Sequence, residues 1–361
     1  MSDIDEPSSG DGAARSDAHS SSGAARRSSL SRRALIFGGL AAGGLAAIGG
    51  GALLYRDMRR SEGPDGTWVK LSPIVPLPRD APRDGSPAFE EPGVDTTVAV
   101  WAHADDDIIF ANPHLSEVIA SGATLRTIFV TAGDAGRGLA YAQQREAGIR
   151  AAYDAMRGSA ASWQTSEITL LSGARVTRFV PSDDPRLSIT VLRLPDGNLS
   201  AKGFPSTGDA GLTQLINGTV PVLAPIDGGP TLDAARLSDT VAELIHAGRP
   251  DHITTNIPHE SVFAHGDHPD HSCVGSLVRA VAPSAGVPAE AVTYYIGYPS
   301  KRQPVNVVGA PLDAKVGVYQ VYAAQDPVVT CDDASACLAQ PGFGQWLRRS
   351  YPKTEGELQL S

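Results

Sequence analysis

Short apolar and β-branched runs alternate with segments of helical spacing over residues 95–330 of the chain. The runs that predict buried strands are Thr96–Trp101, Leu125–Thr131, Ile168–Leu171, Ile189–Leu194, His252–Ile257 and Val292–Ile296. The segments that predict helices are Leu115–Ser121, Gln143–Met156, Leu232–His246, Cys273–Val281 and Leu312–Ala324. This alternation predicts an α/β fold with a mostly parallel sheet and helices on both faces. The stretch 173–230 is rich in strand and turn signals, so we expect a strand-rich elaboration on the sheet edge.

The N-terminal region has a different composition. Residues 1–33 are mainly Ser, Gly, Ala, Asp and Arg, which predicts disorder because they bury too little apolar surface to offset chain entropy. Arg32 and Arg33 precede an uncharged, Gly-rich hydrophobic segment, residues 34–54, a pattern that resembles a twin-arginine export signal. The segment is also long enough to cross a bilayer, so an uncleaved signal-anchor is the alternative.

We therefore expect an exported protein, either secreted or anchored at the outer face of the cytoplasmic membrane, with the twin-arginine export machinery as a partner. Contact with the membrane is expected only through the N-terminal segment if it is not cleaved. Residues 55–94 are rich in Pro and Gly and predict a linker, which leaves residues 95–361 as one catalytic domain.

The amino-acid composition excludes several classes of protein. The 361 residues are 42% hydrophobic, include 3 cysteines and carry a formal net charge of −10. Such a chain is too apolar to be disordered throughout and too poor in cysteine to be a small disulfide scaffold. Its acidic balance, without basic runs that carry aromatics, argues against nucleic-acid binding.

The first predicted strand runs directly into His103, Asp105, Asp106 and Asp107. A histidine and three carboxylates after a buried strand are costly unless something compensates their charge. A helix N-cap is the alternative, but capping accounts for one or two of the aspartates and not for His103.

A second polar cluster follows the strand that ends at Ile257. It comprises His259, His265, Asp267, His268, Asp270 and His271, and a solvated polar loop is its alternative interpretation. His103, one aspartate of 105–107 and either His268 or His271 would form a set of two histidines and one carboxylate. Such a set suits Zn²⁺ with an open position for water, and it also suits Fe²⁺.

Three motifs together resemble the PIG-L/LmbE family of zinc de-N-acetylases. They are His103-Ala-Asp-Asp106, Thr131-Ala-Gly-Asp-Ala-Gly136 and His268-Pro-Asp-His271, in the family's order and spacing. The family's usual first motif is H-P-D-D, so Ala104 departs from it. The resemblance covers roughly residues 95–330 and implies a Rossmann-like, LmbE-like fold. It also implies a zinc hydrolase that removes an acyl group, such as acetyl, from an N-acetylglucosamine-type sugar or glycoconjugate.

The resemblance also assigns roles around the metal. It implies that His103, Asp106 and His271 bind zinc and that Asp105 is the general base. A carboxylate within reach of water on zinc can complete its deprotonation, since zinc lowers the pKa of that water to about 7.

Further roles follow from the same resemblance. His268 would stabilise the oxyanion, with Asp270 as the partner that holds its tautomer and raises its pKa. Arg145 matches an arginine that contacts substrate, and a surface helix arginine is the alternative. The family often has Glu three residues later, where this chain has Gly148, and some members place a Tyr where this chain has Gly266. Any tyrosine that assists catalysis must therefore come from elsewhere.

The cysteines suggest one crosslink. Cys331 and Cys337 lie six residues apart in a loop-like segment of a chain expected to be exported, which favours a disulfide. Cys273 is expected to pack inside a helix as a small hydrophobic residue.

Two alternatives to a sugar deacetylase remain. One is a metal-dependent amidase or esterase that acts on a non-sugar small molecule, and the other is a catalytically silent carbohydrate-binding protein of the same fold. The presence of both Asp105 and His268 argues against a silent protein, because metal ligands alone would suffice for a structural site.

The paired arginines generate a prediction about export. Changing Arg32→Lys together with Arg33→Lys should leave the protein in the cytoplasm, because the twin-arginine route reads the arginine pair and not its charge alone. Cell fractionation and immunoblotting measure this directly. Unchanged export of the double variant would instead indicate the general secretory route.

Overall fold

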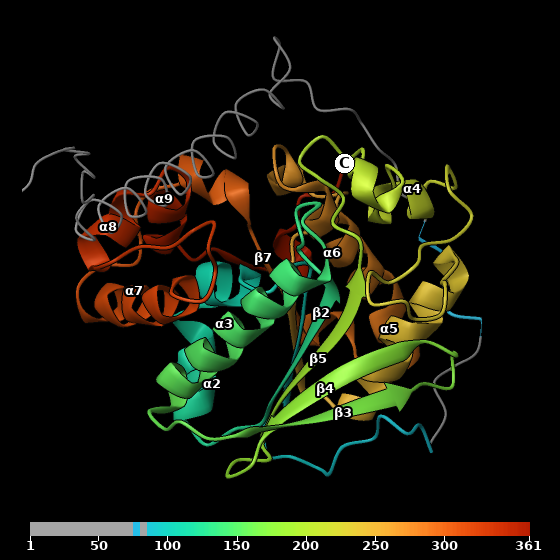
Figure 1. Cartoon of the computed structure of the whole chain (residues 1–361), viewed down its shortest axis with the longest axis horizontal. Helices are drawn as coiled ribbons and strands as arrows, with labels where there is room; N and C mark the ends of the chain where they lie inside the picture. Colours follow the sequence, from blue (N-terminus) through green and yellow to red (C-terminus); the bar gives the residue numbers. More distant parts are fainter. Residues whose placement is uncertain (1–74, 80–84) are drawn as a thin grey trace, which may run out of the picture. The chain divides into compact units, whose positions relative to one another are not determined.

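Five parallel strands form the centre of one sheet in the computed structural model, which describes residues 75–79 and 85–361 (Figure 1). The strands of the sheet are β1 (Thr97–Trp101), β2 (Leu125–Thr131), β3 (Trp163–Thr169), β4 (Arg175–Pro181), β5 (Leu187–Leu194), β6 (His252–Asn256), β7 (Val292–Tyr295) and β8 (Pro352–Thr354). Their order is β3-β4-β5-β2-β1-β6-β7-β8. The strands from β5 to β7 in this order are parallel. At the edges, β3 pairs antiparallel with β4, β4 with β5, and β8 with β7. The predicted α/β fold with a mostly parallel sheet is confirmed.

Helices cover both faces of the sheet (Figure 1). They are α2 (His114–Ala120), α3 (Leu139–Arg157), α4 (Leu212–Ile216), α5 (Ala234–Gly248), α6 (Pro269–Val281), α7 (Ala310–Ala323), α8 (Ala334–Ala339) and α9 (Phe343–Leu347). Because successive side chains of a strand point to opposite faces, β1 feeds two separate hydrophobic cores. Val98 and Val100 join the core under α5 and α6, and Trp101 joins the core under α3 and α7.

The sequence pattern located the central strands and the five longer helices, but it missed five short or polar elements. Strands β4 and β8 were missed, as were helices α4, α8 and α9. β4 lies in the expected edge elaboration and alternates Arg and Thr with apolar residues, whereas β5 belongs to the parallel centre. The predicted strand Ile168–Leu171 is the end of the longer β3, whose mostly exposed, polar residues hide the signal.

The winding of the sheet changes direction at β1, and this change determines where a ligand site is expected. The chain leaves β1 toward β2 and β5 on one side, and later returns to β6 on the other side of β1. In open parallel sheets, ligands bind outside the carboxyl ends of strands where the direction of winding reverses. His103 follows β1 at this edge, and the loop after β6 leads to His268 and His271.

The described part of the expected linker packs against the domain. Residues 85–94 contain no helix or strand, but Ala88 is fully buried in the core. Glu90 lies 2.5 Å from the guanidinium of Arg126, and the Ser86 hydroxyl lies 2.5 Å from the Glu243 carboxylate. Packing therefore extends to the N-terminal side of Asp95, where we had expected the domain to begin.

The predicted disordered segment, residues 1–33, and the hydrophobic segment, residues 34–54, lie outside the described residues. The described residues fall within one compact unit, Leu45–Ser361. Among them, no helix is both long and apolar enough to cross a membrane.

Lys315 of α7 carries a buried amine. It is 1% exposed, and its ammonium group donates a hydrogen bond to the Arg349 carbonyl oxygen at 2.7 Å. Burial lowers the pKa of Lys315 from 10.5 to about 7, because a charged amine loses hydration inside the protein.

This burial predicts a pH-dependent stability. A folded-state pKa below the unfolded value means that the unfolded chain binds the proton more tightly, so folding is penalised at low pH and the penalty falls as pH rises above about 7. Replacing Lys315→Met should therefore raise the free energy of unfolding near pH 6, and the gain should shrink near pH 9 by an amount on the order of 2 kcal/mol. Urea denaturation at both pH values measures it, with the exposed Lys202→Met as control. Equal effects of Lys315→Met at the two pH values would contradict the prediction.

Candidate metal and catalytic centre

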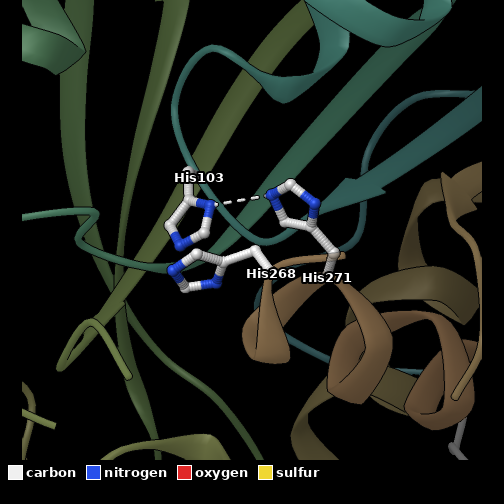
Figure 2. Close-up of side chains that lie close together, drawn as sticks. All are labelled: His103, His268 and His271. Atoms are coloured by element: carbon white, nitrogen blue, oxygen red, sulfur yellow. Dashed lines mark hydrogen bonds between the residues drawn. The ribbon is translucent and has the colours of Figure 1, made fainter. Parts of the chain in front are cut away.

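Three histidines, one after β1 and two at the start of α6, meet at the carboxyl edge of the sheet. His103, His268 and His271 are buried and offer ring nitrogens that lie within 4.8 Å of one another. Figure 2 shows the three rings arranged around a common space, with His103 and His271 joined by a dashed line. His268 is the N-cap of α6 and Pro269 occupies the first helical position, so the motif His-Pro-Asp-His itself starts this helix.

The carboxylate of Asp106 completes a set of three metal donors. His103 Nδ1 lies 3.2 Å from His271 Nε2, and the Asp106 oxygens lie 3.0 Å from His271 Nε2 and 3.6 Å from His103 Nδ1. Two ligands of a tetrahedral zinc ion with bonds of 2.0–2.1 Å are separated by about 3.3 Å. The two ring nitrogens and the Asp106 carboxylate, which faces each ring with a different oxygen, are therefore spaced as the ligands of one divalent cation would be.

Each of these two histidines turns its other nitrogen toward a carboxylate. His271 Nδ1 lies 2.8 Å from Asp267, and His103 Nε2 lies 3.3 Å from Asp270. Such contacts fix the tautomer and orientation of metal-binding imidazoles. Asp267 also accepts hydrogen bonds from the backbone N–H groups of Gly297 and Tyr298, which attaches the ligand to the loop after β7.

A second set of donors shares His103. It consists of His103, Asp196, His268 and Asp270. This set would use His103 Nε2, which faces Asp270, and its His268 Nε2 to Asp196 distance is 3.9 Å. We favour the set with Asp106, because His268 Nδ1 accepts from the Asp270 backbone N–H. The proton of the neutral His268 ring then lies on Nε2, the atom that the second set would need as a metal ligand.

The charges of the ligand set balance one another. Burial alone lowers the pKa of His103 and His271, but the Asp106 carboxylate raises both, that of His271 to about 9. Burial raises the pKa of Asp106, yet the two imidazoles hold it well below its usual value. The site thus requires positive charge where the donors converge, and a divalent cation would supply it in place of the protons.

The third aspartate of the first motif is not a ligand. Asp107 begins a short π-helix, η1 (Asp107–Ala111), and accepts hydrogen bonds from the Tyr153 hydroxyl at 2.7 Å and from the Ile108 N–H. Burial raises the pKa of Asp107 to about 7. Because the chain enters a π-helix here, the Asp106 side chain lies beside His103 and His271, whereas the Asp107 side chain lies in the core.

Asp105 lies on the wall of a cavity next to the metal donors. The cavity has a volume of about 240 Å³. Its polar wall is formed by His103, Asp105, Arg145, Asp196 and His268. Its apolar wall is formed by Leu199, Phe204, Val328, Val329 and Phe343. Burial raises the pKa of Asp105, and the Arg145 guanidinium, 2.5 Å away, lowers it.

His268 differs from the sequence-based expectation. The Asp270 backbone N–H donates to His268 Nδ1 at 3.1 Å, which assigns the proton of the neutral ring to Nε2. The Asp270 carboxylate is 4.0 Å from His268 Nδ1, whereas it lies closer to His103 and accepts from the Gly197 N–H at 2.8 Å. Burial lowers the pKa of His268 to about 4, despite the neighbouring carboxylates. Asp270 is thus mainly the partner of His103, and His268 is a neutral Nε2–H donor.

Arg145 is buried rather than on a helix surface. Its Nη1 donates to the Gly133 carbonyl oxygen at 2.6 Å, and its Nη2 contacts Asp105. Gly133 has φ +54°, and a Cβ at this position would lie 2.1 Å from Arg145 Nη1. The glycine of the Thr-Ala-Gly motif therefore leaves room for the guanidinium.

Several residues of the site had no signal in the sequence. Tyr298 lines the cavity from the loop after β7, stacks on Trp346 at 4.2 Å and packs edge-on against His271. It provides an aromatic hydroxyl group near the site although position 266 is glycine. Asp196 and Asp326 line the cavity too, and neither belongs to a motif that indicated catalysis.

The cysteine predictions agree with the structure. Cys331 and Cys337 form a disulfide with a Cα–Cα distance of 5.1 Å, as predicted. Cys273 is a free thiol buried in the core under α6. In the described part of the chain it belongs to no group of metal donors.

The contact between Asp267 and His271 predicts that the Asp267 carboxylate increases the affinity of the site for metal. Replacing Asp267→Asn should weaken zinc binding about 10- to 100-fold, because the imidazole loses the carboxylate that orients it. Titration of the metal-free protein with zinc by calorimetry measures this. Glu146→Gln is a matched control, since Glu146 is a buried carboxylate that pairs with Arg193. An affinity unchanged by Asp267→Asn would show that Asp267 does not support the ligand.

Comparison with known proteins identifies the family. A search of curated proteins found no match. Among solved structures, the chain is similar to N,N'-diacetylchitobiose deacetylase from Pyrococcus horikoshii, with 12% identity and a TM-score of 0.37 over 65% of this chain and 72% of that chain. It is also similar to the zinc-inhibited form of teicoplanin deacetylase Orf2, with 15% identity and a TM-score of 0.39 over 67% of this chain and 88% of that chain. The family model of GlcNAc-PI de-N-acetylase matches residues 98–282, which contain both histidine motifs. On this match and on the motifs, the chain belongs to the PIG-L family of GlcNAc-PI de-N-acetylases.

Proposed function

We propose that this chain is a zinc-dependent hydrolase that removes an N-acyl group, such as acetyl, from an N-acetylglucosamine-type sugar or glycoconjugate. The family supports deacetylation in general. The observation that carries the proposal is the convergence of His103, Asp106 and His271 next to a cavity that also holds Asp105 and His268. Fe²⁺ is the alternative metal, because the same ligand types suit it.

The donor set defines what a metal would contribute. A divalent cation held by His103, Asp106 and His271 would act as a Lewis acid on the acyl carbonyl and lower the pKa of water. The buried position of the three ligands favours such binding, since their charges require compensation.

Asp105 is placed to move the proton. Its carboxylate lines the cavity and has a pKa raised by burial, so it is a stronger base than an exposed aspartate. It would accept a proton from the attacking water and then, as the carboxylic acid, donate it to the leaving amine nitrogen. One residue thus balances both proton transfers of amide hydrolysis.

His268 is placed to stabilise the negative charge that develops on the acyl oxygen. Its Nε2–H is available because Nδ1 accepts from the Asp270 backbone. A neutral donor of this kind requires no proton uptake before catalysis, and a donor already held in place stabilises an oxyanion without reorganisation. Asp270 would act on the metal ligand His103 and, through its backbone N–H, on the orientation of His268.

The apolar wall of the cavity favours a second candidate. Val328, Val329 and Phe343 offer a surface that suits an apolar group next to the acyl amide. A metal-dependent amidase or esterase that acts on a non-sugar compound would use the same donors and the same base. Faster amine release from an N-acetylated aromatic amine than from N-acetylglucosamine or its octyl glycoside would support this candidate.

Export is part of the proposal. We propose that the protein acts outside the cytoplasm, either secreted or held at the outer face of the cytoplasmic membrane by residues 34–54. The paired arginines support it, and the double lysine substitution described above is its test.

Three substitutions test the proposed roles together. In Asp105→Asn, amine release from N-acetylglucosamine compounds should fall by about 10²- to 10⁴-fold while zinc content is unchanged, because only the base is lost. In His268→Ala, turnover should fall by about 10²- to 10³-fold with zinc retained, and Asp106→Asn should lose the metal. Fluorescent detection of free amine and elemental analysis of the purified proteins measure both quantities.

Two results would contradict the assignment. Loss of zinc from Asp105→Asn would make Asp105 a ligand and exchange its role with Asp106. Binding of these sugars by the unaltered protein without any amine release would indicate a carbohydrate-binding protein of the same fold.

A further inference from the structure

A buried polar cluster joins the end of α7 to the catalytic cavity. Asp326 lies three residues after α7 and is 1% exposed. Its Oδ1 accepts from the Tyr141 hydroxyl and from the Val328 N–H, each at 2.9 Å, and its Oδ2 accepts from the Tyr322 hydroxyl at 2.9 Å. Asp326 and Tyr322 both lie beyond residues 98–282, the region that matches the family model. The C-terminal part of the chain therefore contributes polar groups to this cavity.

Arg145 connects this cluster to Asp105. Its Nε donates to the Tyr322 hydroxyl oxygen at 2.7 Å and lies 3.5 Å from Asp326 Oδ2. Its Nη2 lies 2.5 Å from Asp105 Oδ1. The Tyr322 hydroxyl thus accepts from Arg145 and donates to Asp326, so the contacts run in one line from Asp326 to Asp105.

The backbone allows this line because Gly133, beside Arg145, and Gly148, beside Tyr322, leave space for it. A Cβ at Gly148 would lie 2.9 Å from the ring and from the carbonyl oxygen of Tyr322. Gly148 thereby lets α3 approach α7 where Tyr322 meets Arg145. The family often has Glu at this position, and in this chain a tyrosine from α7 occupies the space.

The charges of Arg145, Asp105 and Asp326 explain what this line of contacts does. Arg145 is buried between two carboxylates, Asp105 and Asp326, and both raise its pKa although burial lowers it. Without Asp326, the guanidinium would lose a buried counter-charge and would be free to move toward other acceptors. Asp105 would then lose the partner that fixes its Oδ1.

We propose that Asp326 and Tyr322 are positioning residues that hold Arg145 against Asp105, so that the C-terminal segment completes the catalytic site. This inference rests on the proposed function, because it assumes that Asp105 is the base. It also gives Arg145 a positioning role, where the sequence had suggested contact with substrate. Neither Asp326 nor Tyr322 takes part in the reaction itself.

The chain offers a matched pair of tyrosines for the test. Tyr322→Phe removes the hydroxyl between Arg145 and Asp326. Tyr319→Phe removes a hydroxyl from the same helix that donates to Gln340 Oε1 at 2.9 Å instead. Both tyrosines are fully buried, so the two variants lose comparable packing and differ in the contact with Arg145.

Steady-state kinetics on the zinc-loaded full chain should separate the two variants. In Tyr322→Phe and in Asp326→Asn, kcat should fall about 10- to 100-fold with KM and zinc content nearly unchanged, because a base displaced by a fraction of an ångström affects the chemical step. Tyr319→Phe should stay within about 2-fold of the unaltered protein, as expected for a hydroxyl outside the line. Thermal unfolding of each variant shows whether a loss of kcat accompanies a loss of folding.

Rescue by a small cation provides a readout that a purely structural role would not change. Guanidinium at millimolar concentration should restore part of kcat in Arg145→Ala, because Asp326 and Asp105 can hold the added cation between them. The double variant Arg145→Ala, Asp326→Asn should show much weaker rescue. Equal rescue in both would overturn the proposal.

The remaining outcomes are also decisive. Unchanged kcat in folded Tyr322→Phe, with Asp105→Asn inactive, would overturn the positioning role and leave the proposed function intact. A rise in the KM of Tyr322→Phe with constant kcat would indicate that Arg145 binds substrate. That result would also overturn the positioning role. No amine release by the unaltered protein from any substrate would overturn both proposals.

Discussion

The Asp106 carboxylate, held between the imidazoles of His103 and His271, is the interaction on which the catalytic centre depends. It lies 3.0 Å from one ring and 3.6 Å from the other, and all three groups are buried. A buried carboxylate is stable only when opposite charge or hydrogen bonds compensate it. The neighbouring carboxylates follow the same rule, since Asp267 faces His271, Asp270 faces His103 and Asp105 faces Arg145. The whole site is a set of buried charges that are stable only together.

The sheet provides the place where such a set can be assembled. β1 and β6 are parallel neighbours, so the chain leaves both at the same edge of the sheet. His103 and Asp106 follow β1, and His271 lies in the first turn of α6, which follows β6. Residues 102–106 connect β1 to the π-helix, and His268 caps the N-terminus of α6. Burial leaves these side chains little conformational freedom, which favours a preformed centre.

The C-terminal segment forms part of the wall of the cavity beside the site. Val328 and Val329 form part of the apolar wall, and only Pro327 separates them from Asp326. The Cys331–Cys337 disulfide and the bond from Gln340 Nε2 to the Val329 carbonyl oxygen, at 2.6 Å, hold this loop. The same segment therefore forms part of the cavity wall and contacts Arg145, the partner of the proposed base Asp105.

The sequence by itself determined the elements and the chemistry that lie close together along the chain. Continuous apolar runs such as Leu125–Thr131 are typical of strands covered on both faces, and β2 is buried at every position. The two histidine motifs indicated the residues of the proposed metal site because each stands next to a strand end or a helix start, where local geometry fixes the position. The short spacing of Cys331 and Cys337 likewise indicated their disulfide.

Only the tertiary structure decided which side chains, distant in the sequence, form hydrogen bonds and ion pairs with the residues of the site. Asp270 follows His268 closely in sequence, yet its carboxylate lies nearer to His103, because the first turn of α6 directs it toward β1. The link from Arg145 to Tyr322 joins residues 177 positions apart, and it required α3 and α7 to pack at Gly148. Spacing along a chain constrains neighbours within one turn or one loop, whereas contacts between elements depend on how their side chains pack. The partners of each catalytic group were therefore set by the packing of whole helices against the sheet, which no local pattern encodes.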